Sequence, residues 1–269
     1  MVRRQINEHQ LAAFVVIVFT WSWSWDAIYY LLGWWDAFVV FPRQWGLPIA
    51  AIVVWWADTE SLRTKLGSVL AWRLRPAFYL VAVLVPVSIS NAQPVVRALG
   101  GGTLAYAPPA SLPLLVAFVL ANMFLFGGVE ELGWRGFLQP RLQHRTSVLT
   151  AGLGIGLLWL LWHLPLFFSG KAAYSLQPLS FLTYTTFILG AAVVLGAFVN
   201  VTDGTVLPVM LMHASINLGP VLEGSSGALA GSKLLPLVFG SGLWWLIVLV
   251  LVLRYGKRMV PEPTATSEA

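Results

Sequence analysis

Long runs of apolar residues are the feature of this sequence that most constrains its fold. One run reads "LAAFVVIVFTWSWSWDAIYYLLGWW" and a later one reads "LPLLVAFVLANMFLF". A helix needs about 20 apolar residues to cross the hydrocarbon core of a bilayer. Of the 269 residues 58% are hydrophobic and 10% are charged, whereas about 25% of the residues in a soluble domain are charged. We therefore expect an integral membrane protein built from helices.

The apolar runs predict an all-α, polytopic membrane helix bundle with about eight transmembrane helices. Glycine, proline and polar residues separate the runs, as expected for loops. The second and seventh predicted helices are short. The eight helices are expected at residues 11–34, 44–57, 76–93, 112–134, 148–168, 179–200, 205–219 and 234–253. A single transmembrane domain over residues 1–258 follows, with a disordered C-terminal tail at 259–269.

The distribution of basic residues predicts the orientation of the bundle. Cytoplasmic loops of membrane proteins are enriched in lysine and arginine. Eight spans with a cytoplasmic N-terminus place most of the 16 Lys and Arg residues inside and leave four outside: Arg43, Arg97, Lys171 and Lys233. We therefore expect both termini in the cytoplasm, and the protein in the cell membrane if its source is prokaryotic. The net charge of +5 then reflects membrane topology, and no nucleic acid is expected as a partner.

Ionisable residues within the apolar runs mark a candidate functional site. Burying such a residue in a membrane helix costs at least about 2.5–3.5 kcal/mol, so it is usually paired, faces the interior and has a function. Three segments carry them, with Glu130, Glu131 and Arg135 in the first, His163 in the second, and His213 with Asn217 in the third. At a rise of about 1.5 Å per residue, all three fall between the membrane midplane and the cytoplasmic side. We expect them to converge.

The spacing in the first segment indicates different roles for its two glutamates. Glu131 and Arg135 are four residues apart, share a helix face and are expected to form an ion pair. Glu130 is rotated by about 100° on a regular helix. Its carboxylate therefore has no local cation and is available as a general base. Asn122 lies two turns earlier on the face of Glu130 and extends a polar stripe.

His213 and Asn217 are also four residues apart and present two hydrogen-bonding groups on one face. Such a pair can donate to a developing oxyanion. Structural roles are the alternative, because a buried His or Asn often joins two membrane helices. The ion pair of Glu131 and Arg135 can likewise be purely structural. The concurrence of three such segments at one depth favours a functional site.

Three segments of the sequence resemble the motifs of a known family. "EELGWRGFLQPRLQ", "WHLP" and "HASIN" are similar to the motifs of the CAAX proteases and bacteriocin-processing enzymes, which include the type II CAAX prenyl endopeptidases. The family pattern is Glu-Glu-x-x-x-Arg, Phe-x-x-x-His and His-x-x-x-Asn or Asp. In the second motif Trp159 stands where the family usually has Phe, a change expected to alter the shape of the pocket more than its chemistry. The resemblance covers residues 112–219.

The resemblance implies an intramembrane endopeptidase whose cavity opens to the cytoplasm. The substrate would be a membrane-associated peptide or protein, and the oligomeric state is not indicated. Trp159 and Asn122 are expected to line the pocket. The remaining roles carried over are water activation by Glu130 and His163, oxyanion stabilisation by His213 and Asn217, and support of the site by Glu131 and Arg135.

A divalent metal such as Zn²⁺ is an alternative cofactor. A catalytic zinc site needs three protein ligands and an open position. Glu130, His163 and His213 are the candidate ligands, and the family is often labelled as metalloproteases. The sequence contains no His-Glu-x-x-His pair, and water activated by a glutamate needs no metal. We therefore favour a metal-independent mechanism and keep the metal site as its rival.

Two other functions fit parts of the pattern. A proton- or ion-coupled transporter also places Glu, His and Arg within the membrane. Secondary transporters often contain internal repeats and paired broken helices, and neither is evident in this sequence. A non-catalytic, immunity-type membrane protein is the third possibility, and the complete set of motif residues argues against it.

Overall fold

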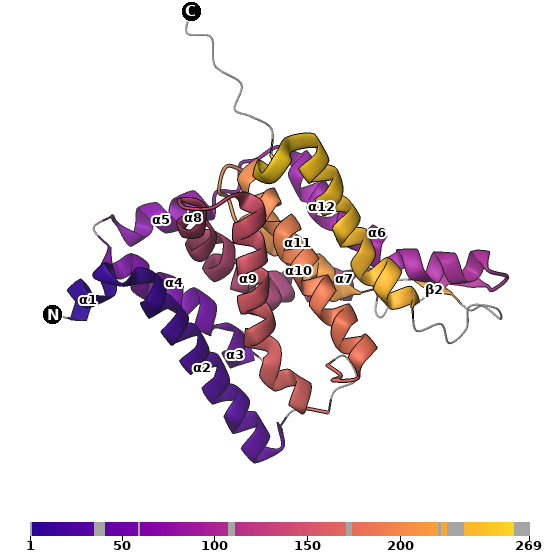
Figure 1. Cartoon of the computed structure of the whole chain (residues 1–269), viewed down its shortest axis with the longest axis horizontal. Coiled ribbons are helices and arrows are strands. Elements are labelled where there is room, and N and C mark those ends of the chain that lie inside the picture. Colours follow the sequence, from indigo (N-terminus) through magenta and orange to yellow (C-terminus); the bar gives the residue numbers. More distant parts are fainter. Residues whose placement is uncertain are drawn as a thin grey trace, which may run out of the picture.

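The computed structural model describes residues 2–34, 41–58, 60–106, 111–170, 174–219, 222–224 and 234–260, which are almost entirely helical (Figure 1). The predicted all-α membrane bundle is confirmed. Two three-residue strands, β1 (Leu104–Tyr106) and β2 (Leu222–Gly224), pair antiparallel. The α-helices are α1 (Val2–Glu8), α2 (Gln10–Leu32), α3 (Phe41–Gln44), α4 (Gly46–Ala57), α5 (Leu62–Val69), α6 (Pro76–Leu99), α7 (Leu112–Leu125), α8 (Gln139–Gln143), α9 (Val148–His163), α10 (Pro178–Val201), α11 (Leu207–Leu218) and α12 (Gly242–Tyr255).

Shorter helical turns of other kinds join or extend these helices. Three are 3₁₀ turns, namely η2 (Gly127–Glu130), η4 (Leu164–Phe168) and η6 (Gly256–Arg258). Two are wider π-helical segments, η3 (Leu132–Leu138) and η5 (Pro236–Ser241). π-helical segments are rare overall, but those that occur are often found at functional sites. Of these two, η3 lies within the segment that carries the paired glutamates.

Six helical segments in the described part of the chain are long and apolar enough to cross a membrane. They are Gln10–Leu32, Pro76–Leu99, Leu112–Glu130, Val148–Phe168, Pro178–Val201 and Pro236–Arg258. The two short helices of the predicted eight are present as α4 and α11, with 12 residues each. Twelve residues rise only about 18 Å, less than the roughly 30 Å hydrocarbon core. Neither α4 nor α11 therefore crosses the membrane by itself.

The segments predicted to be cytoplasmic lie together at one end of the bundle. Arg3 donates a hydrogen bond to the carbonyl of Asp58 at 3.1 Å, which joins α1 to the end of α4. The backbone N–H of Val206 donates to the carbonyl of Val69 at 2.7 Å, which joins the start of α11 to α5. The short helices therefore begin or end at the same face as the N-terminus. Which side of the membrane this face occupies remains a prediction.

The predicted helix over residues 112–134 is interrupted. α7 ends at Leu125, and Phe126 has φ −116° and ψ −126°, outside the helical region. A Cβ atom at Gly128 would lie 2.6 Å from the Cα atom of Met123 and 2.8 Å from the carbonyl oxygen of Met210, so only glycine allows the backbone to approach α11 this closely. The prediction of a single regular helix over residues 112–134 is therefore wrong. The rotation of about 100° between Glu130 and Glu131, which assumed that helix, does not apply.

The outer surface of the bundle is apolar, as the lipid environment requires. Large hydrophobic side chains on the outer helices are exposed, among them Leu31 on α2, Leu84 on α6, Leu112 on α7 and Leu253 on α12. A soluble protein rarely exposes apolar patches of this extent. Together with the six spans, this surface confirms an integral multi-pass membrane protein.

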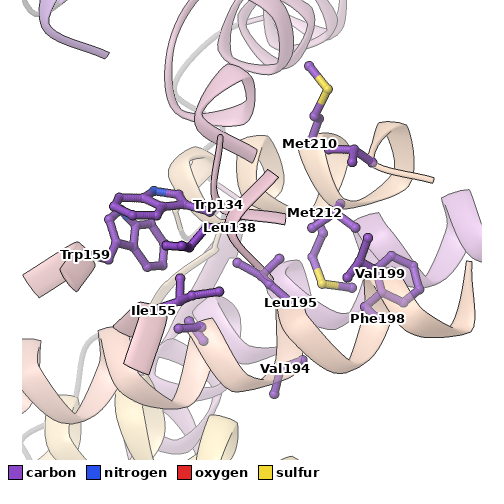
Figure 2. Close-up of a cluster of buried hydrophobic side chains, with 14 of the residues drawn as sticks. Trp134, Leu138, Ile155, Trp159, Val194, Leu195, Phe198, Val199, Met210 and Met212 are labelled. Carbon is purple, nitrogen blue, oxygen red and sulfur yellow. The ribbon is translucent and has the colours of Figure 1, made fainter. Parts of the chain in front are cut away.

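α10 forms the centre of the bundle and packs along α9. Every residue from Gly190 to Val199 is buried. A Cβ atom at Gly152 would lie 2.9 Å from the Cα atom of Val193, so glycine on α9 allows the two backbones to meet. Figure 2 shows the resulting core, with Trp134, Ile155 and Trp159 among its buried side chains.

The predicted disordered tail falls mostly outside the described residues, which end at residue 260. Met259 is fully buried in the core of the bundle. The packed part of the chain therefore reaches at least this residue, one position beyond the predicted domain boundary.

Candidate active site

The predicted site residues come from four parts of the bundle and are mostly buried. Asn122 is on α7, Glu130 is on η2, Trp159 and His163 are on α9, and His213 and Asn217 are on α11. Glu131 lies between η2 and η3, and Arg135 lies on η3. All are buried except Asn217, which is exposed at the edge of the cluster. Charged groups buried to this extent need partners.

Glu131 is the centre of a buried hydrogen-bond network. Nη1 of Arg135 donates to both of its carboxylate oxygens, at 3.1 and 2.8 Å. Nδ1 of His213 lies 2.6 Å from Oε1 of the same carboxylate. Nη2 of Arg135 donates to the carbonyl of Ala192 on α10 at 3.2 Å. The predicted ion pair of Glu131 and Arg135 is therefore present, and it also orients His213.

The contact with Glu131 determines which ring nitrogen of His213 is available. An ionised carboxylate accepts hydrogen bonds and cannot donate them. Nδ1 of His213 therefore donates to Glu131, which leaves Nε2 on the opposite side of the ring. Such a carboxylate–imidazole contact is a common way to fix the orientation of a functional histidine.

Trp159 contacts Glu130 and both histidines of the cluster. Its indole N–H donates to Oε2 of Glu130 at 3.1 Å. Its ring centroid lies 5.8 Å from that of His163 and 5.1 Å from that of His213. A phenylalanine would fill part of this space but has no N–H to donate. Trp in place of the family's usual Phe therefore adds a hydrogen bond to Glu130 as well as volume. The sequence predicted the change in shape but not this hydrogen bond.

His163 is held by its own helix and by aromatic neighbours. Nδ1 of His163 lies 2.8 Å from the carbonyl oxygen of Trp159 and donates to it, because a carbonyl can only accept. Nε2 is left for another partner. The His163 ring stacks on Tyr174 at 6.1 Å and meets Tyr184 edge-on at 5.8 Å. These two tyrosines were not predicted, because both lie outside the three motifs.

Asn217 and His213 face the backbone at Gly127. Nδ2 of Asn217 donates to Oδ1 of Asn122 at 3.0 Å. A Cβ atom at Gly127 would lie 2.2 Å from Nδ2 of Asn217 and 2.8 Å from Nε2 of His213. The two nitrogen atoms therefore approach the same point, and only glycine leaves room for them.

A second buried ion pair lies beside this cluster. Nε of Arg43 lies 2.6 Å from Oδ1 of Asp26, and both side chains are buried. Arg43 is therefore a buried residue of α3, while its assignment to the outer side of the membrane remains a prediction. Asp26 was not predicted as a site residue, although a lone acid in the apolar run "TWSWSWDAIYY" was a signal that could have identified it.

A cavity of about 910 Å³ adjoins the cluster. α6, α10, η5 and α12 supply most of its lining, including Phe187 and Trp244. Tyr184 lines this cavity and also contacts the His163 ring. None of the eight predicted site residues lines it. Tyr184 is therefore the link between the cavity and the cluster.

The metal site kept as an alternative does not fit this arrangement. Glu130, His163 and His213 all belong to the described residues, and among those residues no group of three or more His, Asp or Glu side chains is placed to hold a metal ion. Oε2 of Glu130 accepts from Trp159, and Nδ1 of each histidine is already bonded. No chemical step is therefore assigned to a metal.

The arrangement combines a carboxylate, two oriented imidazoles and an amide in one largely buried cluster. A buried carboxylate near an imidazole suits general acid–base chemistry on water. Oriented N–H donors nearby suit the stabilisation of negative charge that develops on an oxygen. The chain has no cysteine, so no thiol nucleophile competes with this interpretation.

Comparison with known proteins points to the same part of the chain. Residues 112–219 match the family model described as "Type II CAAX prenyl endopeptidase Rce1-like". The chain is 34% identical over 95 residues to CAAX prenyl protease 2 of Methanococcus maripaludis, an alignment that covers 35% of this chain and 32% of that protein. The chain thus matches about a third of the length of this curated relative. The matched family segment contains all eight predicted site residues, whereas Asp26 and Arg43 lie before it.

Proposed function

Because this chain belongs, through residues 112–219, to the type II CAAX prenyl endopeptidase Rce1-like family, we propose that it is an intramembrane endopeptidase that uses an activated water molecule. The substrate in this proposal is a membrane-associated peptide or protein. Glu130 and His163 activate the water, and His213 and Asn217 stabilise the oxyanion. Glu131 and Arg135 support the site.

In the first step, the carboxylate of Glu130 removes a proton from water while the water oxygen attacks the peptide carbonyl carbon. The indole N–H of Trp159 holds Oε2 of Glu130, so Oε1 is the oxygen assigned to the water. Nε2 of His163 accepts a hydrogen bond from the same water, since its Nδ1–H donates to a backbone carbonyl. The products of this step are a tetrahedral oxyanion and a protonated Glu130.

In the second step, the proton on Glu130 passes to the peptide nitrogen, and the C–N bond breaks to release an amine and a carboxylic acid, which then loses its proton to solvent. Before this collapse Nδ2 of Asn217 donates a hydrogen bond to the oxyanion. His213 donates from Nε2 in the form that carries a proton on both ring nitrogens, since its Nδ1–H is bonded to Glu131. Donors that are already oriented stabilise such charge without reorganisation. Glu131 keeps His213 in place, and Arg135 pairs with Glu131.

The observation that carries this proposal is the Glu131 network together with the contact between Trp159 and Glu130. Through them one carboxylate and two imidazoles are fixed in a single aromatic, largely buried cluster. A structural ion pair would need Glu131 and Arg135 alone. It would not account for a second buried carboxylate beside two histidines.

The test is cleavage of membrane-anchored peptides by the purified protein in proteoliposomes. Glu130→Gln removes the base with little change in shape, and we expect kcat to fall by about 10²–10⁴-fold. Glu8→Gln is the matched control, because Glu8 is an exposed glutamate paired with Arg4 on α1 and remote from the site. A strong chelator should leave the wild-type rate unchanged.

Each outcome has a defined meaning. Equal rates for wild type and Glu130→Gln would exclude Glu130 as the base. Loss of activity with the chelator, restored by Zn²⁺, would replace the metal-independent mechanism with a metal-dependent one. If a broad peptide library is not cleaved while the proteoliposomes conduct ions, the protein is a transporter and the proposal is wrong.

A further inference from the structure

A buried cation outside the family-matched segment contacts the end of the helix that carries His163. Arg43 lies on α3, and its side chain is 1% exposed. Its guanidinium carbon lies 3.5 Å from the ring centroid of Trp162, and Nη2 donates to the backbone carbonyl of Trp162. Trp162 immediately precedes His163, and their rings meet edge-on at 4.7 Å. Arg43 therefore touches the chain one residue away from a proposed catalytic histidine.

α2 fixes Arg43 and the preceding Pro42 through three separate contacts. The indole N–H of Trp21 donates to the carbonyl of Pro42 at 2.6 Å. The hydroxyl of Ser22 donates to the carbonyl of Arg43 at 2.9 Å. The carboxylate of Asp26 accepts from Nε of Arg43 at 2.6 Å. Backbone and side chain at this position are both held, which explains the polar residues in the apolar segment "TWSWSWD".

The contact with Trp162 supplies what the end of a helix lacks. α9 passes at His163 into the 3₁₀ turn η4, in which Pro165 has no N–H to donate to the carbonyl of Trp162. A cation is favourable at a helix C-terminus, because the partial charge there is negative. Arg43 provides both a hydrogen-bond donor and a positive charge at this point.

We infer that Arg43, anchored by Asp26, is a positioning residue that fixes the C-terminal end of α9 and thereby the ring of His163. The inference rests on the proposed function and adds two residues that precede the family-matched segment. Arg43 touches neither substrate nor water in this role. It acts through Trp162, so its removal changes the rate of the chemical step more than the binding of substrate.

The test compares Arg43→Lys and Asp26→Asn with wild type. Lysine keeps the positive charge, but a single ammonium group does not reproduce the planar fork that reaches Asp26 and Trp162 together. We expect kcat to fall about tenfold or more in Arg43→Lys, because small displacements of catalytic groups are costly. KM should change by less than about twofold. Asp26→Asn should lower kcat in the same direction and provides a milder variant if Arg43→Lys folds poorly.

Arg141→Lys is the matched control. Arg141 also uses Nε for a side chain on α2, donating to Gln10 at 2.8 Å, and its Nη1 donates to the carbonyl of Phe137 at 3.1 Å. Its guanidinium also lies over an aromatic ring, that of Phe137, at 3.8 Å. We expect kcat of this variant to stay within about twofold of wild type. An equal loss of kcat in Arg141→Lys and Arg43→Lys, or a rise in KM instead of a fall in kcat, would overturn the inference.

NMR of the imidazole nitrogens separates this inference from the proposed function. The chain has four histidines, so a sample labelled with ¹⁵N-histidine gives few signals, and His163→Gln assigns the one of interest. We expect the His163 signals to shift or broaden in Arg43→Lys, while they stay unchanged in Arg141→Lys. Unchanged His163 signals in Arg43→Lys and Asp26→Asn would refute the positioning role. If wild type cleaves no peptide but the His163 signals still shift in Arg43→Lys, the positioning role is retained and only the endopeptidase function is rejected.

Discussion

The buried carboxylate of Glu131 is stabilised by two partners, the guanidinium of Arg135 and the imidazole of His213. Removing one partner of a buried ion pair leaves an uncompensated charge, which is far more costly than the pair is worth. The same chain contains an exposed pair with the same spacing, Arg4 and Glu8, joined at 2.7 Å. The two pairs allow a direct comparison of buried and exposed charges.

We predict that Arg135→Met lowers the free energy of unfolding by about 3–5 kcal/mol, because Glu131 would then be buried without a cation. Arg4→Met should lower it by less than about 1 kcal/mol, as is typical of exposed pairs. Unfolding of the detergent-solubilised protein by denaturant measures both values. Similar losses in the two variants would contradict the view that Glu131 depends on Arg135.

Local spacing was sufficient to predict the contact of Glu131 with Arg135 but not the contacts of Arg43. The first pair is four residues apart in a helical segment, so the sequence fixes its geometry. Arg43 meets Asp26 from another helix, and its second partner, Trp162, is 119 residues away. Such contacts depend on how α2, α3 and α9 pack, and a count of charges on loops does not contain that information.

At the scale of the element, the interruption between α7 and η3 shapes the site. A regular helix from 112 to 134 was predicted because the segment is apolar without a break. That helix ends where Gly128 closely approaches Met210 on α11. The approach depends on packing against a helix that comes much later in the chain. The interruption places Gly127 directly beside Asn217 and His213. A helix boundary of this kind follows from tertiary packing and has no local signal beyond the two adjacent glycines.

We predict that Gly127→Ala lowers kcat about 100-fold, because a methyl group there would displace two groups assigned to the oxyanion. Gly154→Ala on α9 is the control, since a Cβ atom at Gly154 has no neighbour within 4 Å. That variant should keep its activity and gain about 0.4–1 kcal/mol of stability. Cleavage rates and thermal unfolding of both variants test this. Full activity of Gly127→Ala would show that His213 and Asn217 do not act at this point.

At the scale of the whole molecule, the chain returns repeatedly to one end of the bundle. Arg141 on α8 donates to Gln10 at the start of α2, which adds the segment after the paired glutamates to the end that already holds Asp58 and Val69. Figure 1 shows α5 and α8 at this end of the bundle. The pattern of basic residues assigns this end to the cytoplasm, and the bundle gathers those segments as that assignment requires.

We predict that Thr146→Cys, in the loop before α9, reacts with a membrane-impermeant maleimide only after intact cells are disrupted. Leu176→Cys, in the loop before α10, should react from outside. The chain has no cysteine, so each variant carries a single thiol. Thr146 and Leu176 are both exposed, so a difference in labelling reports the side of the membrane. The reverse pattern would place the paired-glutamate end of the bundle outside the cell.

The ion pair of Asp26 and Arg43 also bears on how the protein enters the membrane during synthesis. Both residues belong to the N-terminal unit formed by α2, α3 and α4, which leaves the ribosome long before α9. A lone arginine or aspartate resists insertion into lipid, but within this unit each charge has its partner from the start. The first helices can therefore enter the bilayer as a neutral pair, with a hydrogen-bond donor ready for a carbonyl that is made 119 residues later.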